Sequence, residues 1–310
     1  MTCLALNARL GCLDSDITED SNQMKIIRAV GDIFSNSQIL DNGLQMWRFF
    51  PSRRLNNFHH GYNVFRDMCK AYIDEAVIEI KKKQATDGQE EGDPSMLELF
   101  FSRGVDENTA VVMALDMMFA GVDTSSHTSG FLMYQLAKHP NVQERLFQEV
   151  KAELPEKDSK LALKSLDKMP YMKAVLKETL RMNPPAVANA RIIDEPLEIG
   201  GYSMPAGVVY VPHHYLMCNS ERYFNEPNTF KPERWLRSEN NQKIHPFLLL
   251  PFGHGPRMCV GRRFAEQEIS IFIAKIVRNF RIEWHHKDLR MKTETLTRPD
   301  NPLKFTFLDR

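Results

Sequence analysis

The sequence predicts a predominantly helical α+β protein. Stretches with apolar residues three and four positions apart, the spacing of an amphipathic helix, recur along the chain as far as Met182. Short apolar runs bounded by Gly and Pro follow between Leu197 and Val211, and they indicate strands and turns. One more amphipathic stretch, 261–279, precedes two further short apolar runs near the end of the chain, 281–284 and 303–307. Helices therefore dominate, and the sheet is minor.

The composition is that of a globular protein of about two domains or one large one. The chain has 310 residues, of which 43% are hydrophobic and 26% charged, enough for a sizeable core. Its 40 basic and 40 acidic residues cancel, which argues against a nucleic-acid binder that works through bulk charge. Mean hydropathy is -0.39, and no uncharged apolar run reaches the roughly 18 residues of a membrane span. The five scattered cysteines favour a reducing intracellular setting over a disulfide scaffold.

The first ten residues resemble the inside of an amphipathic helix with no cap before it. They show neither a charged segment followed by an apolar core nor an Arg/Ser-rich transit peptide. We therefore expect a partial chain, with any targeting segment outside this sequence.

The first third of the chain predicts two helices, over 24–33 and 65–83. Between them lies an aromatic and basic connection, MWRFFPSRR at 46–54. Packing of its rings into the core is the commoner outcome, and contact with a membrane interface is the alternative. The stretch 84–95 is polar and lacks periodicity, which predicts an exposed linker.

A long central helix is expected next. Asp106 is a good N-cap for it, and Pro140 stops it at about His139. Its first half, 110–122, is apolar on nearly every face except at Asp116, which places this helix inside the protein. Two further helices are predicted over 141–154 and 170–182.

The last third is less regular. Strands are expected at 197–199 and 208–211, and the stretch 223–251 is rich in Pro and aromatic residues with little periodicity. Long irregular segments usually carry function. A helix over 261–279 and a terminal hairpin of 281–284 with 303–307 complete the prediction.

The segment PFGHGPRMCVGRRFA, at 251–265, is the most informative of the sequence. Cys259 lies there in a glycine-rich turn at the mouth of a helix, and glycines allow backbone conformations closed to other residues. Backbone N–H groups, the helix N-terminus and Arg257 all stabilise a thiolate. From the residues alone three interpretations stay open: a thiolate metal ligand, a thiolate nucleophile, or a buried inert cysteine.

The pattern Phe252-x-x-Gly255-x-Arg257-x-Cys259-x-Gly261 resembles the haem-binding loop of the cytochrome P-450 family, the haem-thiolate monooxygenases. The resemblance implies a bound haem b with Cys259 as the axial ligand of the iron. It also implies that Phe252 packs over the haem near the sulfur and that Arg257 pairs with a haem propionate. A zinc site is disfavoured because no second Cys or His stands at ligand spacing.

Glu178 and Arg181 stand three apart on one face of a helix, where most such pairs are ordinary surface ion pairs. The family carries a Glu-x-x-Arg at this point, completed by an arginine from an irregular loop, here Arg234. The resemblance implies a buried network that fixes the loop of Cys259. Arg191 matches the family position of a second propionate partner, with a plain surface arginine as the alternative.

Gly121 stands inside the long helix, where glycine costs roughly 1 kcal/mol relative to alanine. A kink with back-bonded hydroxyls is one explanation for it and for the polar run at 123–126. The segment AGVDT at 120–124 resembles the family's oxygen-binding groove. That resemblance implies space for O₂ beside Gly121 and a proton relay through Asp123 and Thr124.

Lys173 and Lys177 stand four apart just before Glu178. A basic stripe of this kind suits an acidic partner, and a solvated helix face is the alternative. Together with Arg262 and Arg263 the lysines resemble the mitochondrial class of the family, in which such lysines dock a ferredoxin of the adrenodoxin type.

The resemblance as a whole implies a single cytochrome P-450 domain over 1–310, mainly helical with small sheets and without the N-terminal part of the family fold. It implies a monooxygenase that inserts one atom of O₂ into an apolar small molecule, steroid-like or foreign, with electrons from the ferredoxin. The implied location is the matrix side of the mitochondrial inner membrane, with the loop 47–58 as part of a membrane-facing substrate entrance. Three alternatives stay open: an endoplasmic-reticulum monooxygenase served by a flavoprotein reductase, a truncated product that cannot hold haem, and a cysteine hydrolase with His254 as its base.

Overall fold

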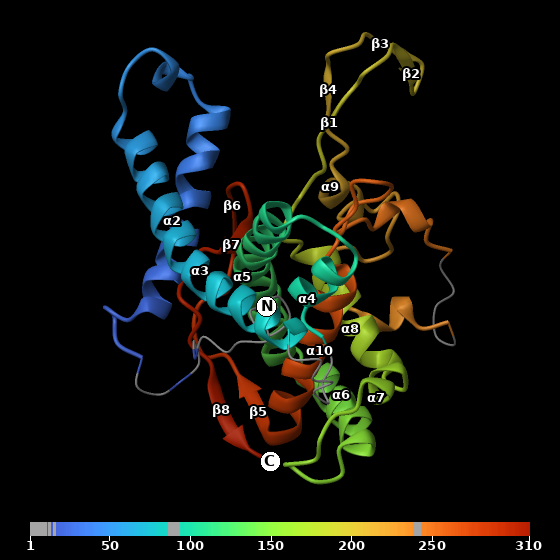
Figure 1. The fold of residues 1–310 in the computed structure, drawn as a ribbon. Helices are drawn as coiled ribbons and strands as arrows, with labels where there is room; N and C mark the ends of the chain where they lie inside the picture. The colour runs from blue at the N-terminus through green and yellow to red at the C-terminus, as the bar shows by residue number, and fades with distance from the viewer. Residues whose placement is uncertain (1–10, 12–13, 15–16, 86–93, 238–242) are drawn as a thin grey trace. The chain divides into compact units, whose positions relative to one another are not determined.

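The computed structural model describes residues 11, 14, 17–85, 94–237 and 243–310 (Figure 1). The chain divides into two compact units, 1–124 and 125–310. The division falls within the long helix α5 (Glu107–Lys138), which gives its first half to one unit and its second half to the other. The predicted linker over 84–95 falls mostly on 86–93, outside the described residues.

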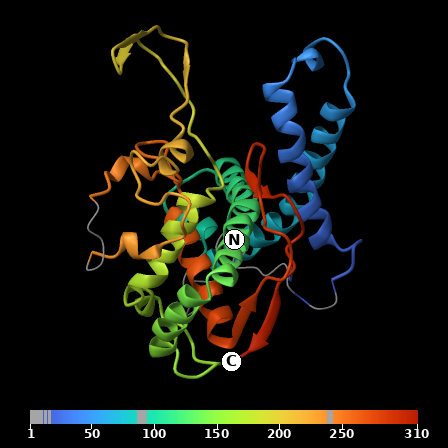
Figure 2. The ribbon, with the colours of Figure 1, turned by 180° about the vertical axis from the view of Figure 1, so that it is seen from behind.

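The first unit is helical throughout its described part. It contains α2 (Asn22–Asn42), the short 3₁₀ helix η1 (Met46–Arg48), α3 (Arg53–Ala85), α4 (Met96–Ser102) and the first half of α5. Helices α2 and α3 lie side by side along their length (Figures 1 and 2). Both predicted helices are therefore confirmed, and both are longer than their apolar periodicity alone indicates.

Side-chain caps set where these helices begin. The Ser21 hydroxyl accepts the Met24 N–H, and the Ser52 hydroxyl accepts the Leu55 N–H at 3.1 Å. The Asp106 carboxylate accepts the Thr109 N–H at 3.0 Å, and hydrogen bonds from the side chain and the main chain of Thr109 lower the pKa of Asp106. The predicted cap of the long helix is thus confirmed.

The core of the first unit is apolar and rich in aromatic rings. Phe119 of α5 stacks on Phe34 of α2 with ring centroids 4.7 Å apart, and it meets Phe65 of α3 edge-on at 5.6 Å. Ala114 and Met118 of α5 are buried in the same cluster. One side of the first half of α5 therefore lies in a core, as its composition predicts, whereas Val112 and Met113 on another side are 55% and 38% exposed.

The connection between α2 and α3 corrects one prediction. Its rings do not pack into the core, because Phe49 is 78% exposed and Phe50 62% exposed. Only Trp47 is partly covered, and its indole N–H donates to the Leu40 carbonyl at 2.9 Å. The loop therefore presents apolar rings outward from the unit.

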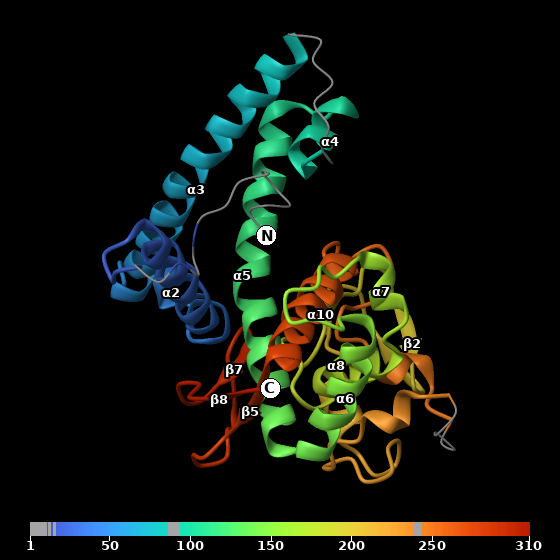
Figure 3. The same cartoon turned by 90° about the horizontal axis from the view of Figure 1, so that it is seen from below.

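The second unit packs four helical segments around one core. These are the second half of α5, α6 (Pro140–Glu153), α8 (Pro170–Met182) and α10 (Arg262–Asn279), and Figure 3 shows α6, α8 and α10 lying against one another. Four shorter elements cover their edges: α7 (Leu163–Asp167), α9 (His214–Cys218), η2 (Pro232–Trp235) and η3 (Pro246–Leu248). The boundaries of α8 are those that the sequence predicts.

Every strand in the described residues pairs with one antiparallel partner. The pairs are β1 (Arg191–Ile192) with β4 (Val209–Tyr210), β2 (Leu197–Ile199) with β3 (Tyr202–Met204), β5 (Phe280–Glu283) with β8 (Thr306–Asp309), and β6 (Met291–Thr293) with β7 (Thr297–Pro299). Gly200 and Gly201 join β2 to β3 with φ of +58° and +83°, the left-handed conformation that a two-residue hairpin turn of the primed type requires. The predicted strands at 197–199 and 208–211 are confirmed. The terminal hairpin also forms, but its second strand lies at Thr306–Asp309 rather than at the predicted 303–307.

Within the part of the chain that the structure describes, no helix combines the length and the apolar character needed to cross a membrane.

Candidate functional site

Cys259 lies on a tight loop that leads into α10. Gly253 and Gly255 adopt φ of +72° and +79°, which only glycine takes without strain. These turns fold the loop back so that the Cys259 N–H donates to the Phe252 carbonyl at 2.8 Å. Gly261 then begins α10 as its N-cap residue. The predicted glycine-rich turn at a helix mouth is the geometry observed.

The Cys259 thiol is exposed, unlike the other cysteines in the described residues. Cys69 and Cys218 are fully buried, and burial raises the pKa of each thiol to about 12. A β-carbon at Gly261 would lie 4.0 Å from the Cys259 sulfur, an ordinary contact, so the helix start lies directly beside the sulfur. The alternative that Cys259 is a buried inert cysteine is therefore wrong; Cys69 and Cys218 are the buried ones.

These surroundings fit an iron porphyrin better than a zinc ion. The described residues contain no cluster of three or more His, Cys, Asp or Glu that would complete a zinc site. Cys259 instead offers a single soft sulfur between two exposed apolar side chains, Met258 (43%) and Val260 (87%). One thiolate ligand flanked by uncovered apolar surface suits a large apolar macrocycle that takes one axial ligand from the protein.

The remaining haem-binding candidates lie as follows. Phe252 is partly buried against the core of the second unit, and the Arg262 guanidinium lies 5.5 Å from its ring centroid. Arg257 and Arg191 are exposed, and Arg191 donates to the Ala190 carbonyl at 2.7 Å. Neither guanidinium forms an ion pair with a carboxylate of the described residues, which leaves both positive charges available to an anionic group.

Glu178 forms the centre of a buried charged network. Its carboxylate receives two hydrogen bonds from Arg181, at 2.9 and 3.0 Å, and one from Arg234 Nε at 2.9 Å. The side chains of Glu178 and Arg181 are fully buried, and that of Arg234 is 4% exposed. The structure therefore brings the three predicted members together in the interior, whereas the alternative was an ordinary surface pair.

Main-chain carbonyls compensate the excess positive charge of this network. One carboxylate faces two guanidinium groups, and the arginines donate their other N–H groups to carbonyls within 218–229, namely those of Cys218, Asn225, Glu226, Pro227 and Thr229. Glu226 has φ of +49°, a conformation uncommon for a residue other than glycine. The network thus holds an irregular segment in one conformation.

Sequence reasoning missed two members of the network. The Trp235 indole donates to Glu178 Oε2 at 2.8 Å, and the Lys231 N–H donates to Glu178 Oε1 at 3.0 Å. The signal for Trp235 was available, because a tryptophan directly after a buried arginine needs an acceptor for its own N–H. Nothing in the sequence singles out a main-chain N–H.

Cys218 links the network to the loop of Cys259. Its carbonyl accepts from Arg181 Nη1 at 2.9 Å, and its thiol donates to the Leu248 carbonyl at 3.1 Å. Leu248 ends η3, three residues before Pro251 and the glycine turn. A continuous path of contacts therefore runs from Glu178 to the segment that carries Cys259.

Replacing Cys218 with alanine tests this path. We expect a loss of about 1–2 kcal/mol of unfolding free energy, because a buried sulfur and one hydrogen bond disappear. We also expect faster hydrogen exchange at the amides of 246–259. Cys69→Ala is the matched control, since it removes an equally buried thiol from the first unit. Equal exchange over 246–259 in both variants would show that Cys218 does not hold the loop.

Lys173 and Lys177 form the exposed stripe of α8. All residues of this helix from Tyr171 to Arg181 are buried except these two lysines. The Lys173 ammonium pairs with the exposed Asp167 at 3.0 Å, and the Lys177 ammonium lies 5.9 Å from the Trp235 ring centroid. Packing thus leaves α8 one face, and that face is basic.

The model of the family described as Cytochrome P450 matches residues 1–307 of the chain. The chain belongs to the cytochrome P450 family. Its mainly helical fold with small antiparallel sheets agrees with this membership, and both predictions are confirmed.

Three P450 relatives from Drosophila melanogaster illustrate the match. They are the probable cytochrome P450 301a1, mitochondrial, at 36% identity over 97% of this chain, the probable cytochrome P450 49a1 at 35% over 97%, and the probable cytochrome P450 12a5, mitochondrial, at 36% over 100%. The chain spans 55%, 52% and 59% of these relatives, respectively.

The P450 groove candidates lie in the first unit, on α5. The helix is continuous from Glu107 to Lys138, so Gly121 does not break it. The Thr124 hydroxyl donates to the Ala120 carbonyl at 2.7 Å, which is the back-bonding that the sequence offers as an alternative. The preceding residue, Asp123, is partly buried. A relay through Thr124 therefore requires its hydroxyl to rotate away from the backbone.

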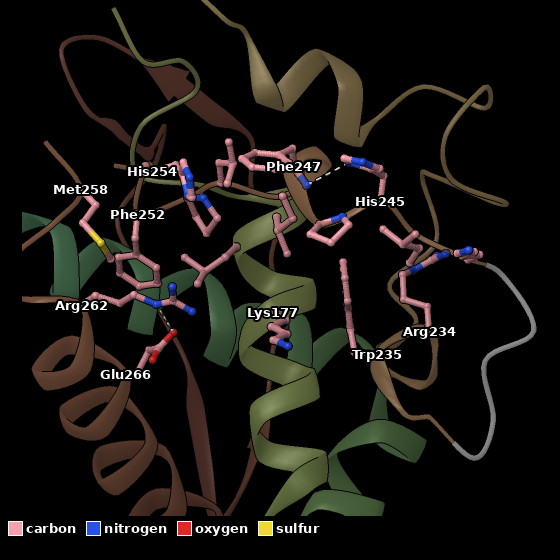
Figure 4. A pocket seen from close by; sticks show the side chains of 18 of the residues that line it. Lys177, Arg234, Trp235, His245, Phe247, Phe252, His254, Met258, Arg262 and Glu266 are labelled. Atoms are coloured by element: carbon pink, nitrogen blue, oxygen red, sulfur yellow. Dashed lines mark hydrogen bonds and ion pairs between the residues drawn. The ribbon is translucent and has the colours of Figure 1, made fainter. Parts of the chain in front are cut away.

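A depression of about 990 Å³ lies beside the cysteine loop of this P450, within the second unit (Figure 4). Most of its wall comes from residues 234–237 and 243–250, and α8, the cysteine loop and the start of α10 complete it. Basic groups outnumber acidic ones. The lining cations are Lys177, Arg234, Arg237, Lys243 and Arg262, and the lining carboxylate is Glu266, which pairs with Arg262 at 3.1 Å. Lys177 connects this basic depression to the exposed stripe of α8.

His254 does not act as a base toward Cys259 in this structure. Its ring packs edge-on against Phe247, with centroids 4.8 Å apart (Figure 4), and no hydrogen bond joins it to Cys259. The arrangement that a cysteine hydrolase needs is therefore not assembled in the described residues.

Proposed function

We propose that this P450 is a haem-thiolate monooxygenase that inserts one atom of O₂ into an apolar small molecule. The observation that carries the proposal is the exposed Cys259 thiol on a glycine loop, backed by the buried Glu178 network and linked to it through Cys218. A thiolate-bound haem supplies the activation of O₂. The protein supplies the ligand, the pocket and the path for protons.

The residues of this chain take the following parts. The Cys259 sulfur would hold the iron as a thiolate, and Phe252 would pack over the haem near the sulfur. Arg257 and Arg191 pair with the propionates, since both guanidinium groups are exposed and lack a carboxylate partner in the described residues. Asp123 and the Thr124 hydroxyl carry protons inward, once that hydroxyl releases the Ala120 carbonyl.

The spectrum of the reduced protein with carbon monoxide tests the proposal. A red-shifted Soret band of the thiolate type supports the monooxygenase. A chain that takes up no haem supports the truncated product. Labelling of Cys259 by an acylating substrate, without haem, supports the hydrolase.

We propose a ferredoxin of the adrenodoxin type as the electron donor, and the matrix side of the mitochondrial inner membrane as the location. Two of the relatives named above are called mitochondrial. The basic stripe of Lys173 and Lys177 and the adjoining depression offer an acidic protein a complementary surface next to the cysteine loop. A flavoprotein reductase of the endoplasmic reticulum is the alternative donor.

Reversing the two charges tests the donor. The double variant Lys173→Glu, Lys177→Glu is expected to weaken ferredoxin binding by at least about tenfold at low salt, with a smaller effect at high salt. Binding titrations and ferredoxin-driven turnover measure this effect, while haem content stays unchanged because both side chains are exposed. The control is Lys157→Glu with Lys160→Glu, two exposed lysines of the same unit. Unchanged affinity in the first variant would remove the assignment.

We also propose that the connection between α2 and α3 contacts the membrane. Leu44, Phe49 and Phe50 are 91%, 78% and 62% exposed, and the nearby Arg53 and Arg54 are exposed as well. Apolar side chains flanked by arginines suit an interface with anionic lipid. This loop then forms part of the entrance for apolar substrates.

Vesicle binding tests this contact. The variant Phe49→Ser, Phe50→Ser is expected to bind phosphatidylcholine–cardiolipin vesicles at least about tenfold more weakly, because inserting each ring is worth on the order of 1 kcal/mol or more. Sedimentation with the vesicles gives the affinity. Tyr202→Ser, which removes a ring that is 75% exposed in the second unit, is the control. Equal binding by both variants would contradict the proposal.

A further inference from the structure

The basic depression beside the cysteine loop has the size of a small-molecule site. Its volume of about 990 Å³ lies at the upper end of the roughly 300–1,000 Å³ that such pockets enclose. Every described residue that lines it belongs to the second unit. The positive charge of the depression is enough to attract a ferredoxin, but it explains neither the hollow nor the aromatic side chain that lies in it.

This aromatic side chain is Phe247 of η3. Its side chain lines the depression and is 51% exposed. Two imidazole rings flank it: that of His254 meets it edge-on with centroids 4.8 Å apart, and that of His245 lies 5.8 Å away at an angle of 30°. Figure 4 shows the three rings along one side of the depression. They offer a planar aromatic ligand a surface on which to stack.

The same depression contains positive charges that no carboxylate of the described residues compensates. Lys177, Arg237 and Lys243 line it, are exposed, and form no ion pair with the described residues. Arg262 differs from them, because it pairs with Glu266 at 3.1 Å. Three uncompensated cations beside exposed rings suit a ligand that combines several negative charges with a flat ring.

We propose that the basic depression binds a nucleoside triphosphate. The base stacks on Phe247 between the two imidazoles, and the phosphates pair with Lys177, Arg237 and Lys243. Stacking accepts any base, because every base has a π-face, so the proposal names the class of ligand rather than one base. Neither haem nor a redox partner takes part in this binding.

The nucleotide and the ferredoxin are expected to compete, since Lys177 belongs to both surfaces. This consequence rests on the proposed ferredoxin-dependent function, whereas nucleotide binding itself does not. In ferredoxin-driven turnover, a nucleoside triphosphate is expected to raise the KM for ferredoxin and to leave kcat unchanged, because excess ferredoxin displaces it.

Titration of the full chain with three probes tests the binding. ATP carries both the base and the phosphates, inorganic tripolyphosphate only the phosphates, and adenosine only the base. In magnesium-free buffer we expect ATP to bind at least about tenfold more tightly than either of the other two, measured by calorimetry. Tripolyphosphate carries at least as much negative charge as ATP, so attraction by charge alone predicts no such preference.

Replacing the aromatic ring separates stacking from charge. Phe247→Ala is expected to remove the preference for ATP and to leave the affinity for tripolyphosphate unchanged, whereas Phe247→Tyr keeps the preference. Phe307→Ala is the matched control, because it removes another exposed phenylalanine of the second unit, with 46% exposure, from outside the depression.

Replacing the cations locates the phosphates. The double variant Lys177→Gln, Arg237→Gln is expected to weaken the binding of both ATP and tripolyphosphate by at least about tenfold at low salt. Lys157→Gln with Lys160→Gln is the control, since these two exposed lysines of the same unit do not line the depression.

Three results would overturn the proposal. These are equal affinities for ATP and tripolyphosphate in the wild type, an undiminished preference for ATP in Phe247→Ala, and equal weakening in the two double variants. If ATP binds as expected but leaves the KM for ferredoxin unchanged, the nucleotide site stands and the ferredoxin is misplaced at this surface. The two proposals therefore fail separately.

Discussion

Replacing Glu178 with glutamine is expected to destabilise the second unit by about 3–5 kcal/mol, the usual cost of removing one partner from a buried ion pair. The variant keeps the shape of the side chain but leaves Arg181 and Arg234 facing each other without a negative charge. Both guanidinium groups are buried, so water cannot take over the role of the carboxylate. Denaturant unfolding of the wild type and the variant measures the difference.

The effect extends beyond stability. The arginines hold the carbonyls of 218–229, and Cys218 continues the path to Leu248. We therefore expect Glu178→Gln to lose haem more readily than the wild type even at temperatures where both are folded. Glu226→Gln is the matched control, because it breaks only an exposed pair with Lys231 and is expected to leave the unfolding free energy nearly unchanged. Similar losses of unfolding free energy and of haem in Glu178→Gln and Glu226→Gln would contradict the structural role of the network.

Replacing Cys259 with serine is expected to abolish the thiolate-type carbon monoxide band while leaving the fold intact. Only the sulfur donates the electron density that produces this band. The side chain is exposed and its backbone N–H still donates to the Phe252 carbonyl, so the unfolding free energy is expected to change by about 0.5 kcal/mol or less.

Spectra and unfolding curves of the same preparations decide this prediction. Val260→Ser is the control, since it changes the neighbouring exposed residue and keeps the sulfur. The band is expected in the wild type and in Val260→Ser and to be absent from Cys259→Ser. A thiolate-type band in Cys259→Ser would remove Cys259 as the ligand, and with it the proposed function.

Local chemistry was enough to predict much of the secondary structure. Pro170 and Asn183-Pro184 delimit α8, and Asp106 and Pro140 delimit α5, because caps and prolines act within one turn of the chain. The start of α3 was predicted too late, at 65 rather than Arg53. Its first turns follow the Ser52 cap, but their apolar periodicity is weak. Of the two interpretations of 46–54, core packing of its rings was the commoner and is wrong for Phe49 and Phe50, because their exposure depends on which surface the surrounding helices leave uncovered.

The candidate site divides in a similar way. The glycine pattern around Cys259 and the pair of Glu178 with Arg181 stand in the sequence as residue types at fixed spacing. The carbonyl groups that accept hydrogen bonds from Arg181 and Arg234 cannot be predicted in this way. Every residue has a carbonyl group, and only folding selects those within 218–229. The sequence likewise does not predict that Cys218 links the network to the cysteine loop, because this contact exists only once α9 packs against η3.

The sequence by itself determined the family, the helical character of the chain and the cysteine of the candidate site, since each depends on residue types and their order. Tertiary structure alone decided which charges are buried, which face of α8 stays exposed, and which rings and cations line the basic depression. These properties arise from contacts between residues far apart in the chain, and packing fixes them only when the helices come together.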